Sequence, residues 1–286
     1  MKGRAIAHGA VTIVNAISTG KGAALGIDLL TEAKVELTRD SKQVEVSIIG
    51  GKNEDTTLAK ESVNVVLKHF SNNKLGAHVE VKSQIPIARG LKSSSTAANA
   101  IVLATLCALG KKIPDEDVVK LGVDAAFKAE VTITGAYDDA CASYFGGAVL
   151  TDNYGRKILK QSNVDENLVA VIYVPTARTY TQKFPKERLN PFRYAVEMAF
   201  ELAMKGEYWK ALTLNGLIHS SALSVSTKPA VDALLNGALA AGLSGTGPSI
   251  AAIAKKEDSK QIVSAWSSLS GKILTANLTN SKARCA

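Results

Sequence analysis

Apolar and polar residues alternate with a period of two in several stretches of the first half of the chain. The alternation is clearest in three of them, residues 34–38, 43–49 and 77–83. This period predicts β-strands with one solvent face, and the polar turn around Asp40 and Ser41 predicts that the first two stretches form a hairpin. Because strands of this kind belong to antiparallel sheets, we expect a mainly antiparallel sheet with helices on its other face.

Apolar residues also recur at helical spacing between and after these strands. The spacing predicts helices over residues 56–70, over 115–130 after Pro114, and from Ser93 onward. The helix that follows Ser93 is rich in alanine and has no charged residue through Leu106.

The second half of the chain follows a polar, loop-like stretch at residues 152–167, where we place a domain boundary. A near-continuous apolar run predicts a buried strand at 168–175. Further elements are predicted as helices at about 190–205, 207–222 and 228–242, a strand after the loop at 243–249, a helix at 256–269 and a strand at 272–278. The prediction is therefore an N-terminal domain, residues 1–160, and a C-terminal domain, residues 161–286, of ferredoxin-like α+β type.

Composition indicates a cytoplasmic enzyme or binding protein. The 286 residues are 46% hydrophobic and 21% charged, and no apolar run is long enough to cross a membrane. The cysteines, Cys107, Cys141 and Cys285, are far apart and odd in number, which gives no disulfide framework or metal spacing and fits a reducing compartment. The four histidines are equally scattered, and for each one a surface or structural role is expected.

The net charge of +8 leaves two classes of partner open. One is nucleic acid, which would bind tightly and with strong salt dependence. The other is a polyanionic small molecule, because Lys and Arg are interleaved with Asp and Glu and only 5% of the residues are aromatic.

The stretch from Ile85 to Leu106 has the features of an anion site. A loop containing Arg89, Gly90 and Lys92 leads to the hydroxyls of residues 93–95 and then to the apolar helix. The first backbone N–H groups of a helix have no intrahelical partner and the helix dipole is positive there, so phosphate is a suitable ligand. A plain serine-capped helix is the alternative.

Two common nucleotide-binding patterns are absent. The Walker A pattern fails because Gly20-Lys21 is followed by Gly22, and Asn15 stands where the first glycine should be. The strand, Gly-rich turn, helix and downstream acid of a dinucleotide-binding fold are also missing. A nucleotide, if bound, is held in another way.

Three segments in order resemble the motifs of the GHMP small-molecule kinases, which include galactokinase, homoserine kinase and mevalonate kinase. PIARGLKSSSTAANA resembles the phosphate-binding motif, TGAYDDACASYFGG the catalytic-aspartate segment, and SGTGPS the third, Gly-rich motif. The resemblance spans the whole chain. It implies an α+β protein in which an N-terminal domain like ribosomal protein S5 precedes a ferredoxin-like sandwich, with ATP and Mg²⁺ as cofactors.

Within this family, NAISTGKGAALGI and TGAYDDA look most like segments of the archaeal-type shikimate kinases. That similarity implies transfer of the ATP γ-phosphoryl group to the 3-hydroxyl of shikimate. The partners are then small molecules, with neither nucleic acid nor membrane, and the chain is a monomer or homodimer. A homoserine or other small-alcohol kinase is the nearest alternative, and an RNA-binding protein with an S5-like domain is the alternative of another class.

The resemblance also implies roles for individual residues. Those expected around the nucleotide are Pro86, Ile87, Ala88, Arg89, Gly90, Leu91, Lys92, Ser93, Ser94 and Ser95. Ser94 would reach Mg²⁺, together with Glu130. Gly245, Thr246 and Gly247 would shape the site near the substrate.

The catalytic carboxylate is expected to be Asp139, which lies seven residues before Gly146 as the family's aspartate does before its Gly-Gly. Asp138 is then free to begin a helix. The lysine of the family's first motif is missing here, so Lys21 is the candidate for positive charge near the transferred group. Lys92 stands where many relatives have glycine. Its side chain could contact phosphate or could point to solvent, and the sequence leaves both orientations open.

The substrate requires further contacts. Arg178 is a candidate to bind the shikimate carboxylate because a guanidinium group can contact a carboxylate with two hydrogen bonds. Asn15 and Ser18 are candidates to bind its hydroxyls.

Overall fold

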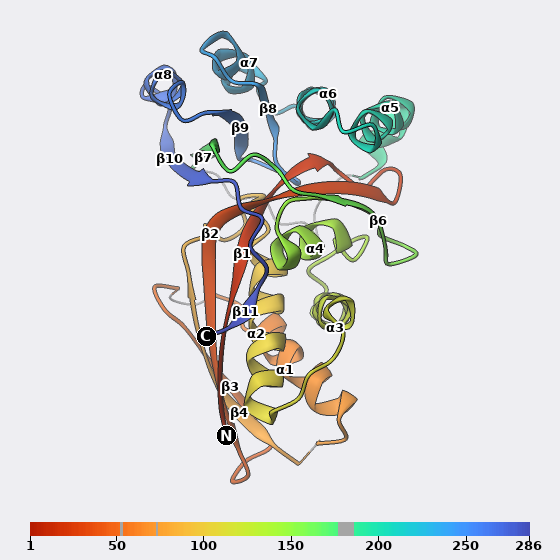
Figure 1. Ribbon diagram of the computed structural model, residues 1–286, viewed down its shortest axis with the longest axis vertical. Helices are drawn as coiled ribbons and strands as arrows, with labels where there is room; N and C mark the ends of the chain where they lie inside the picture. The colour runs from red at the N-terminus through yellow and green to blue at the C-terminus, as the bar shows by residue number, and fades with distance from the viewer. Residues whose placement is uncertain (52–53, 73, 177–185) are drawn as a thin grey trace.

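The chain builds two sheets, each with its own helices (Figure 1). The computed structural model describes residues 1–51, 54–72, 74–176 and 186–286. The first sheet has seven strands in this part of the chain, ordered β11-β1-β2-β4-β3, with β5 paired to β2 and β6 paired to β5. Its strands are β1 (Lys2–Val14), β2 (Lys21–Thr38), β3 (Val44–Ile48), β4 (Gly76–Ser83), β5 (Ala148–Asp152), β6 (Lys157–Ser162) and β11 (Arg284–Cys285).

The pairing of β3 corrects the predicted hairpin. Neighbouring strands of the first sheet are antiparallel, as expected, except that β3 pairs in parallel with β4 and not with β2. The start of β4 lies against the loop before β3, because a Cβ on Gly76 would lie 2.4 Å from the carbonyl oxygens of Ser41 and Gln43. Alternation predicts a strand but not its partner, so the error lies in the pairing alone.

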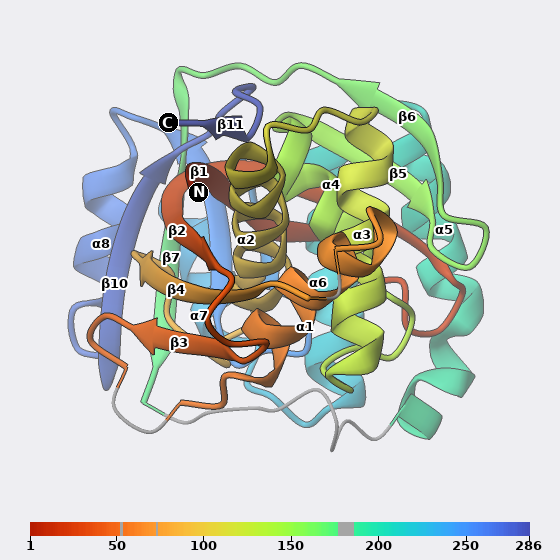
Figure 2. The ribbon, with the colours of Figure 1, turned by 90° about the horizontal axis from the view of Figure 1, so that it is seen from below.

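Four helices cover one face of the first sheet (Figure 1). They are α1 (Thr57–His69), α2 (Ser93–Leu109), α3 (Asp115–Lys128) and α4 (Tyr137–Phe145). Helix α2 lies centrally against β1 and β2, with the other three beside it (Figure 2), and most of its apolar side chains are buried. The amide of Asn99 donates a 2.8 Å hydrogen bond to the carbonyl of Ala140 and so attaches α4 to α2.

The second sheet has four antiparallel strands in the order β10-β7-β9-β8. They are β7 (Leu168–Pro175), β8 (Ala240–Leu243), β9 (Ile250–Lys255) and β10 (Gly271–Asn277). Its helical segments are η2 (Lys186–Phe192), α5 (Arg193–Met204), α6 (Tyr208–Ala222), α7 (Lys228–Leu235) and α8 (Ser259–Trp266). Two boundaries differ from the prediction, because α7 ends before Gly237, where φ is +94°, and β6 lies in the polar stretch assigned to a loop.

Two hydrophobic cores share the C-terminal part of β1 and the N-terminal part of β2. Ala10 and Ala24 belong to the core under α2, whereas the alternate residues Val11 and Leu25 belong to the core that includes the second sheet. Successive side chains of a strand point to opposite faces, so both faces of these strands are buried here. This burial holds the two sheets together at the place where the predicted motifs meet.

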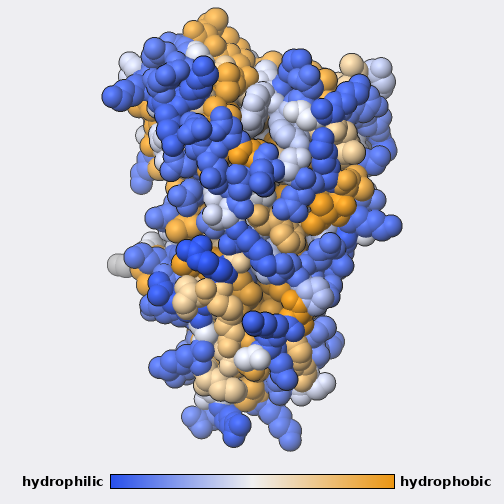
Figure 3. All heavy atoms as spheres, viewed as in Figure 1, coloured by the Kyte–Doolittle hydropathy of each residue, from blue (hydrophilic) through white to orange (hydrophobic). Residues whose placement is uncertain are grey.

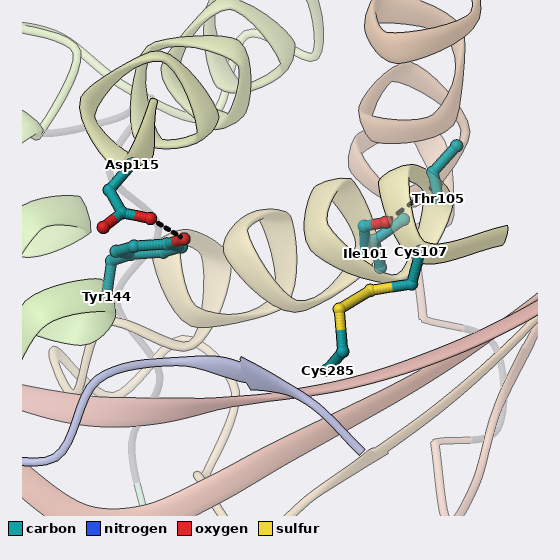
Figure 4. Close-up of a disulfide and its surroundings, with 6 residues drawn as sticks. All are labelled: Ile101, Thr105, Cys107, Asp115, Tyr144 and Cys285. Carbon is teal, nitrogen blue, oxygen red and sulfur yellow. Dashed lines mark hydrogen bonds between the residues drawn. A yellow bond between two sulfur atoms is a disulfide. The ribbon is translucent and has the colours of Figure 1, made fainter. Parts of the chain in front are cut away.

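The end of the chain returns to the first sheet, where Cys285 of β11 lies opposite Ala5 of β1. Cys285 forms a disulfide with Cys107 of α2 (Figure 4), with 6.5 Å between their Cα atoms. The expectation of no disulfide is therefore wrong, and the cysteine pattern no longer supports a reducing compartment. The pairing was not readable from spacing because 178 residues separate the two cysteines. The division at residue 160 stays a prediction.

Polar side chains cover most of the molecular face seen in Figure 3, with apolar groups among them. Along β1, β2 and β4, exposed cations pair with acids, as in Arg4–Glu32 at 2.8 Å and Lys34–Glu80 at 2.7 Å. No helix among the described residues is both long and apolar enough to span a bilayer.

Candidate active site

A cavity of about 430 Å³ lies where the predicted motifs converge. It is lined by the loop before α2, the first turns of α2 and α4, the end of β1 and the loop after β8. Its wall also has apolar side chains, among them Ile48, Leu58, Ile87, Ile101 and Ile133. A volume of this size with a few convergent polar groups suits a small-molecule ligand.

The start of α2 has the properties expected of an anion site. No side chain in the described part of the chain caps the helix, and Ser93, Ser94 and Ser95 line the cavity at its first turn. Backbone N–H groups of this turn therefore remain available for a ligand, and the positive end of the helix dipole faces the cavity. Of the predicted loop, Pro86 and Leu91 do not line the cavity. Leu91 is buried in the hydrophobic core instead.

The loop between β8 and β9 supports the loop before α2 directly. The hydroxyl of Ser244 donates a 2.8 Å hydrogen bond to the carbonyl of Gly90. Gly90 has φ of +78°, and a Cβ on it would lie 2.2 Å from the Ser244 carbonyl oxygen, so only glycine fits there. Thr12 accepts a 2.8 Å hydrogen bond from the backbone N–H of Gly245. The end of β1 and the loop before α2 thus hold the Gly-rich loop after β8 in place.

Lys92 and Asp139 form a buried ion pair at the centre of the cavity. Their Nζ and Oδ1 atoms are 3.0 Å apart, and their side chains are only 7% and 14% exposed. Burial raises the pKa of Asp139, and the Lys92 ammonium opposes that rise. Of the two orientations open for Lys92, the one toward solvent is therefore wrong, and its side chain points into the site.

Asp138 has a different environment from that of its neighbour. Its Oδ1 accepts a 2.8 Å hydrogen bond from Asn153 Nδ2, and its backbone N–H donates to Asn153 Oδ1 at 3.1 Å. Asn153 also binds the hydroxyls of Thr134 and Thr151. Burial, and then the charge of Asp139, raise the pKa of Asp138 to about 7. Both residues line the cavity, but Asp138 is held by its hydrogen bonds to Asn153, whereas Asp139 pairs with Lys92.

Several predicted site residues lie elsewhere. Lys21 is exposed, with its Nζ 6.0 Å from the centre of the Phe200 ring, and it does not line the cavity. Glu130 is exposed and also outside the lining, although the next residue, Val131, contributes to it. The structure therefore does not bring Lys21 or Glu130 to Asp139. Arg178 lies outside the described residues.

The predicted substrate contacts divide in a similar way. Gly245, Thr246 and Asn15 line the cavity, whereas Gly247 and Ser18 do not. The Asn15 amide donates to the Gly245 carbonyl at 3.0 Å, and its Oδ1 accepts from the backbone N–H of Ile17 at 2.9 Å. Asn15 therefore connects the segment after β1 with the Gly-rich loop after β8. The hydroxyl of Ser18 is buried and has no hydrogen-bond partner among the residues that the structure describes.

Sequence reasoning missed the support that α6 gives to this site. Asn215 accepts a 3.1 Å hydrogen bond from the backbone N–H of Asn15 through its Oδ1. His219 is fully buried, and its Nδ1 lies 2.9 Å from the Asn215 carbonyl oxygen. The pKa of His219 is lowered to about 4, chiefly by burial and in smaller part by the charge of Lys92, while the hydrogen bond with the Asn215 carbonyl opposes the shift. No local motif marks these two residues, because they act from a helix about 200 residues away from Asn15.

A helix start that suits anions and a buried Lys–Asp pair at the same cavity fit the transfer of a phosphoryl group to a small molecule. The family comparisons agree, since residues 57–147 match the model of the GHMP kinases N terminal domain and 210–271 that of the GHMP kinases C terminal. The chain belongs to the GHMP kinase family, whose members use ATP.

Curated relatives match along nearly the whole chain. It is 44% identical to a shikimate kinase from Methanococcoides burtonii over 283 residues, 97% of this chain and 96% of that protein. It is 45% identical to a shikimate kinase from Pyrococcus furiosus over 276 residues, 96% of this chain and 99% of that one.

Solved structures show the same fold at much lower identity. Homoserine kinase from Cytophaga hutchinsonii superposes with a TM-score of 0.79 at 19% identity, covering 100% of this chain and 97% of that chain. Mevalonate kinase from Methanococcus jannaschii gives 0.76 at 15% identity, covering 98% of each chain. The predicted GHMP kinase architecture is therefore confirmed.

Proposed function

We propose that this protein is a shikimate kinase, which transfers the γ-phosphoryl group of ATP to the 3-hydroxyl of shikimate. The observation that carries the proposal is the 44–45% identity with proteins named shikimate kinase, which extends over almost the full length of both chains. The geometry of the site supports it, because phosphoryl transfer depends on positioning and on charge around the transferred group.

In this proposal the residues divide the task. The first turn of α2, with its uncapped backbone N–H groups and the hydroxyls of Ser93 to Ser95, binds the phosphates. Asp139 lies at the cavity surface, where its carboxylate orients the alcohol and accepts its proton. Asp138 and Asn153 hold the start of α4, and with it Asp139, in place.

The donor set also fits Mg²⁺ that arrives with the nucleotide. Among the described residues, no cluster of three or more acidic, histidine or cysteine side chains could cage a metal ion. Mg²⁺ is commonly held by substrate phosphates with one or two protein oxygens, and the Ser94 hydroxyl lines the cavity for that purpose. The bound ion would neutralise charge on the phosphates.

The remaining assignments are proposals of the same kind. The partners are shikimate and ATP, without a nucleic acid, in a cytoplasmic monomer or homodimer. Paired charges along the open face of the first sheet, such as Arg4–Glu32, offer little free positive charge for RNA. Arg178 remains the candidate for the shikimate carboxylate. A homoserine or other small-alcohol kinase remains the alternative, because one fold serves many alcohols.

A substrate panel tests the proposal. Purified protein with ATP and Mg²⁺ is assayed for ADP release with shikimate, homoserine or mevalonate, and phosphorus NMR identifies the product. The expected result is rapid, shikimate-dependent ADP release with a new phosphomonoester signal. Turnover of homoserine or mevalonate but not of shikimate would reassign the substrate.

A further inference from the structure

We propose that Lys92 is a catalytic residue, whose ammonium group contacts the transferring phosphoryl group and keeps Asp139 ionised. The inference rests on the proposed kinase function and deepens it. It assigns to Lys92 the role for which the sequence had favoured Lys21, and it makes the departure at position 92 part of the chemistry.

The placement of Lys92 is the first support. Its side chain is 7% exposed, lines the cavity and ends 3.0 Å from Asp139 Oδ1. A Cβ on Gly245 would lie 2.9 Å from Lys92 Nζ, so the ammonium group also lies against the third motif. Lys92 immediately precedes Ser93, where the uncapped helix begins. Its charge is therefore between the phosphate-binding turn and the carboxylate that receives the proton.

The charges around Asp139 are the second support. Asp138 immediately precedes Asp139 in the first turn of α4. Because the two carboxylates are so close, ionisation of both at once is disfavoured. His219 on α6 is neutral at physiological pH because its pKa is about 4, and Arg89 lies in the wall of the same cavity. Lys92 forms an ion pair with Asp139 from the loop that leads into α2. An ammonium at 3.0 Å favours the ionised carboxylate, which the reaction requires.

The backbone is the third support. Lys92 has φ of +64° and ψ of +26°, the left-handed conformation, although it is neither Gly nor Asn. This conformation is unfavourable for a residue with a side chain, because its Cβ comes too close to the following carbonyl oxygen. Strain of this kind is retained where the surrounding structure holds a functional side chain in place. Glycine would adopt the same backbone without strain, so a Lys92→Gly variant is expected to fold.

The reaction step balances without any change in Lys92. The 3-hydroxyl oxygen of shikimate forms a bond to the γ-phosphorus as the bond from that phosphorus to the bridging oxygen breaks, and ADP leaves with the bonding electrons. The hydroxyl proton passes to the Asp139 carboxylate. Lys92 stays protonated and stabilises the charge on the phosphoryl oxygens, as cations do in other phosphoryl transfers.

The test compares Lys92→Met and Lys92→Gly with Lys21→Met, a control that removes the exposed lysine outside the cavity. We expect kcat with shikimate to fall at least about 100-fold in both Lys92 variants and to stay within about twofold in the control. In Lys92→Gly, added ethylammonium should restore part of the rate. Wild-type kcat in Lys92→Met, or equal losses in the Lys21 control, would overturn the proposal.

A second measurement does not depend on the substrate. Carbon NMR of labelled aspartate should show a higher pKa for Asp139 in Lys92→Met than in the wild type, because the neighbouring cation is lost. An unchanged pKa contradicts the proposed role. If the wild type does not phosphorylate shikimate, the proposed function fails, whereas this titration still decides whether Lys92 controls Asp139.

Discussion

Gly22 of β2 packs directly on the carboxylate of Asp138, and replacing it with alanine should displace the catalytic helix. A Cβ at this position would lie 2.3 Å from Asp138 Oδ2, 2.6 Å from its Cγ and 2.9 Å from Ala16 Cβ. Ordinary contacts are about 3.5–4.0 Å, so atoms must move by about 1 Å. Asp138 cannot turn aside without losing its 2.8 Å hydrogen bond to Asn153.

The expected effect of Gly22→Ala follows from that displacement. Overpacking costs about 1–3 kcal/mol of stability, and a shift of about 1 Å at a reacting group costs up to about 100-fold in rate. We therefore expect a lower melting temperature and a loss of kcat of about 10- to 100-fold, the size of loss that a displacement of about 1 Å causes. Circular dichroism and the ADP-release assay measure the two effects.

Gly122→Ala in α3 is the matched control. A Cβ there would lie no closer than 3.2 Å to another group, the Asn99 side chain, and alanine favours helices. Because the helix preference of alanine offsets this one tight contact with a side-chain atom, the variant should keep wild-type activity and a stability within about 1 kcal/mol of the wild type. If Gly22→Ala behaves like Gly122→Ala, the packing of β2 on Asp138 does not position the site, and the reasoning is refuted.

Two further predictions concern the disulfide and pH. Cys285→Ser should lower the unfolding free energy by about 2–4 kcal/mol, because it removes the disulfide. The value of kcat should not change, since Cys107 is about 20 Å along α2 from Ser93. Equal denaturant midpoints for the wild type with and without reductant would contradict the stability effect. The raised pKa of Asp138, about 7, means that the folded state keeps a proton which the unfolded state releases near pH 4. The stability contributed by this group is thus present below pH 4 and lost as pH rises through about 7, and Asp138→Asn should remove that slope from a series of urea titrations.

Local signals in the sequence predicted the parts of the site that lie on single segments. The loop from Arg89 to Ser95 and the helix after it are contiguous, so glycine, hydroxyls and an apolar run were enough to indicate an anion site. Asp139 was predicted in another way, through the resemblance to the GHMP kinases, whose catalytic aspartate has the spacing to a Gly-Gly pair that Asp139 has to Gly146. The structure places both at one cavity.

Contacts between distant segments could not be predicted in this way. Lys92 and Lys21 are both lysines beside glycine-rich sequence, and only the packing of α4 on α2 distinguishes the buried one from the exposed one. Asn153 lay in a polar stretch expected to be a loop, and its role depends on the turn that returns it to Asp138. The Cys107–Cys285 bond likewise depends on a two-residue strand, too short to leave a pattern.

The most direct test of the account is shikimate-dependent turnover by Asp139→Asn beside the wild type, with nucleotide affinity measured in parallel. Asparagine keeps the shape of the side chain but removes the charge that orients the hydroxyl and accepts its proton. The account predicts that the wild type converts shikimate and ATP to a phosphomonoester and ADP, and that the variant binds nucleotide normally but turns over at least about 1,000-fold more slowly. A variant with near-normal kcat would contradict the assignment of Asp139 and the mechanism built on it.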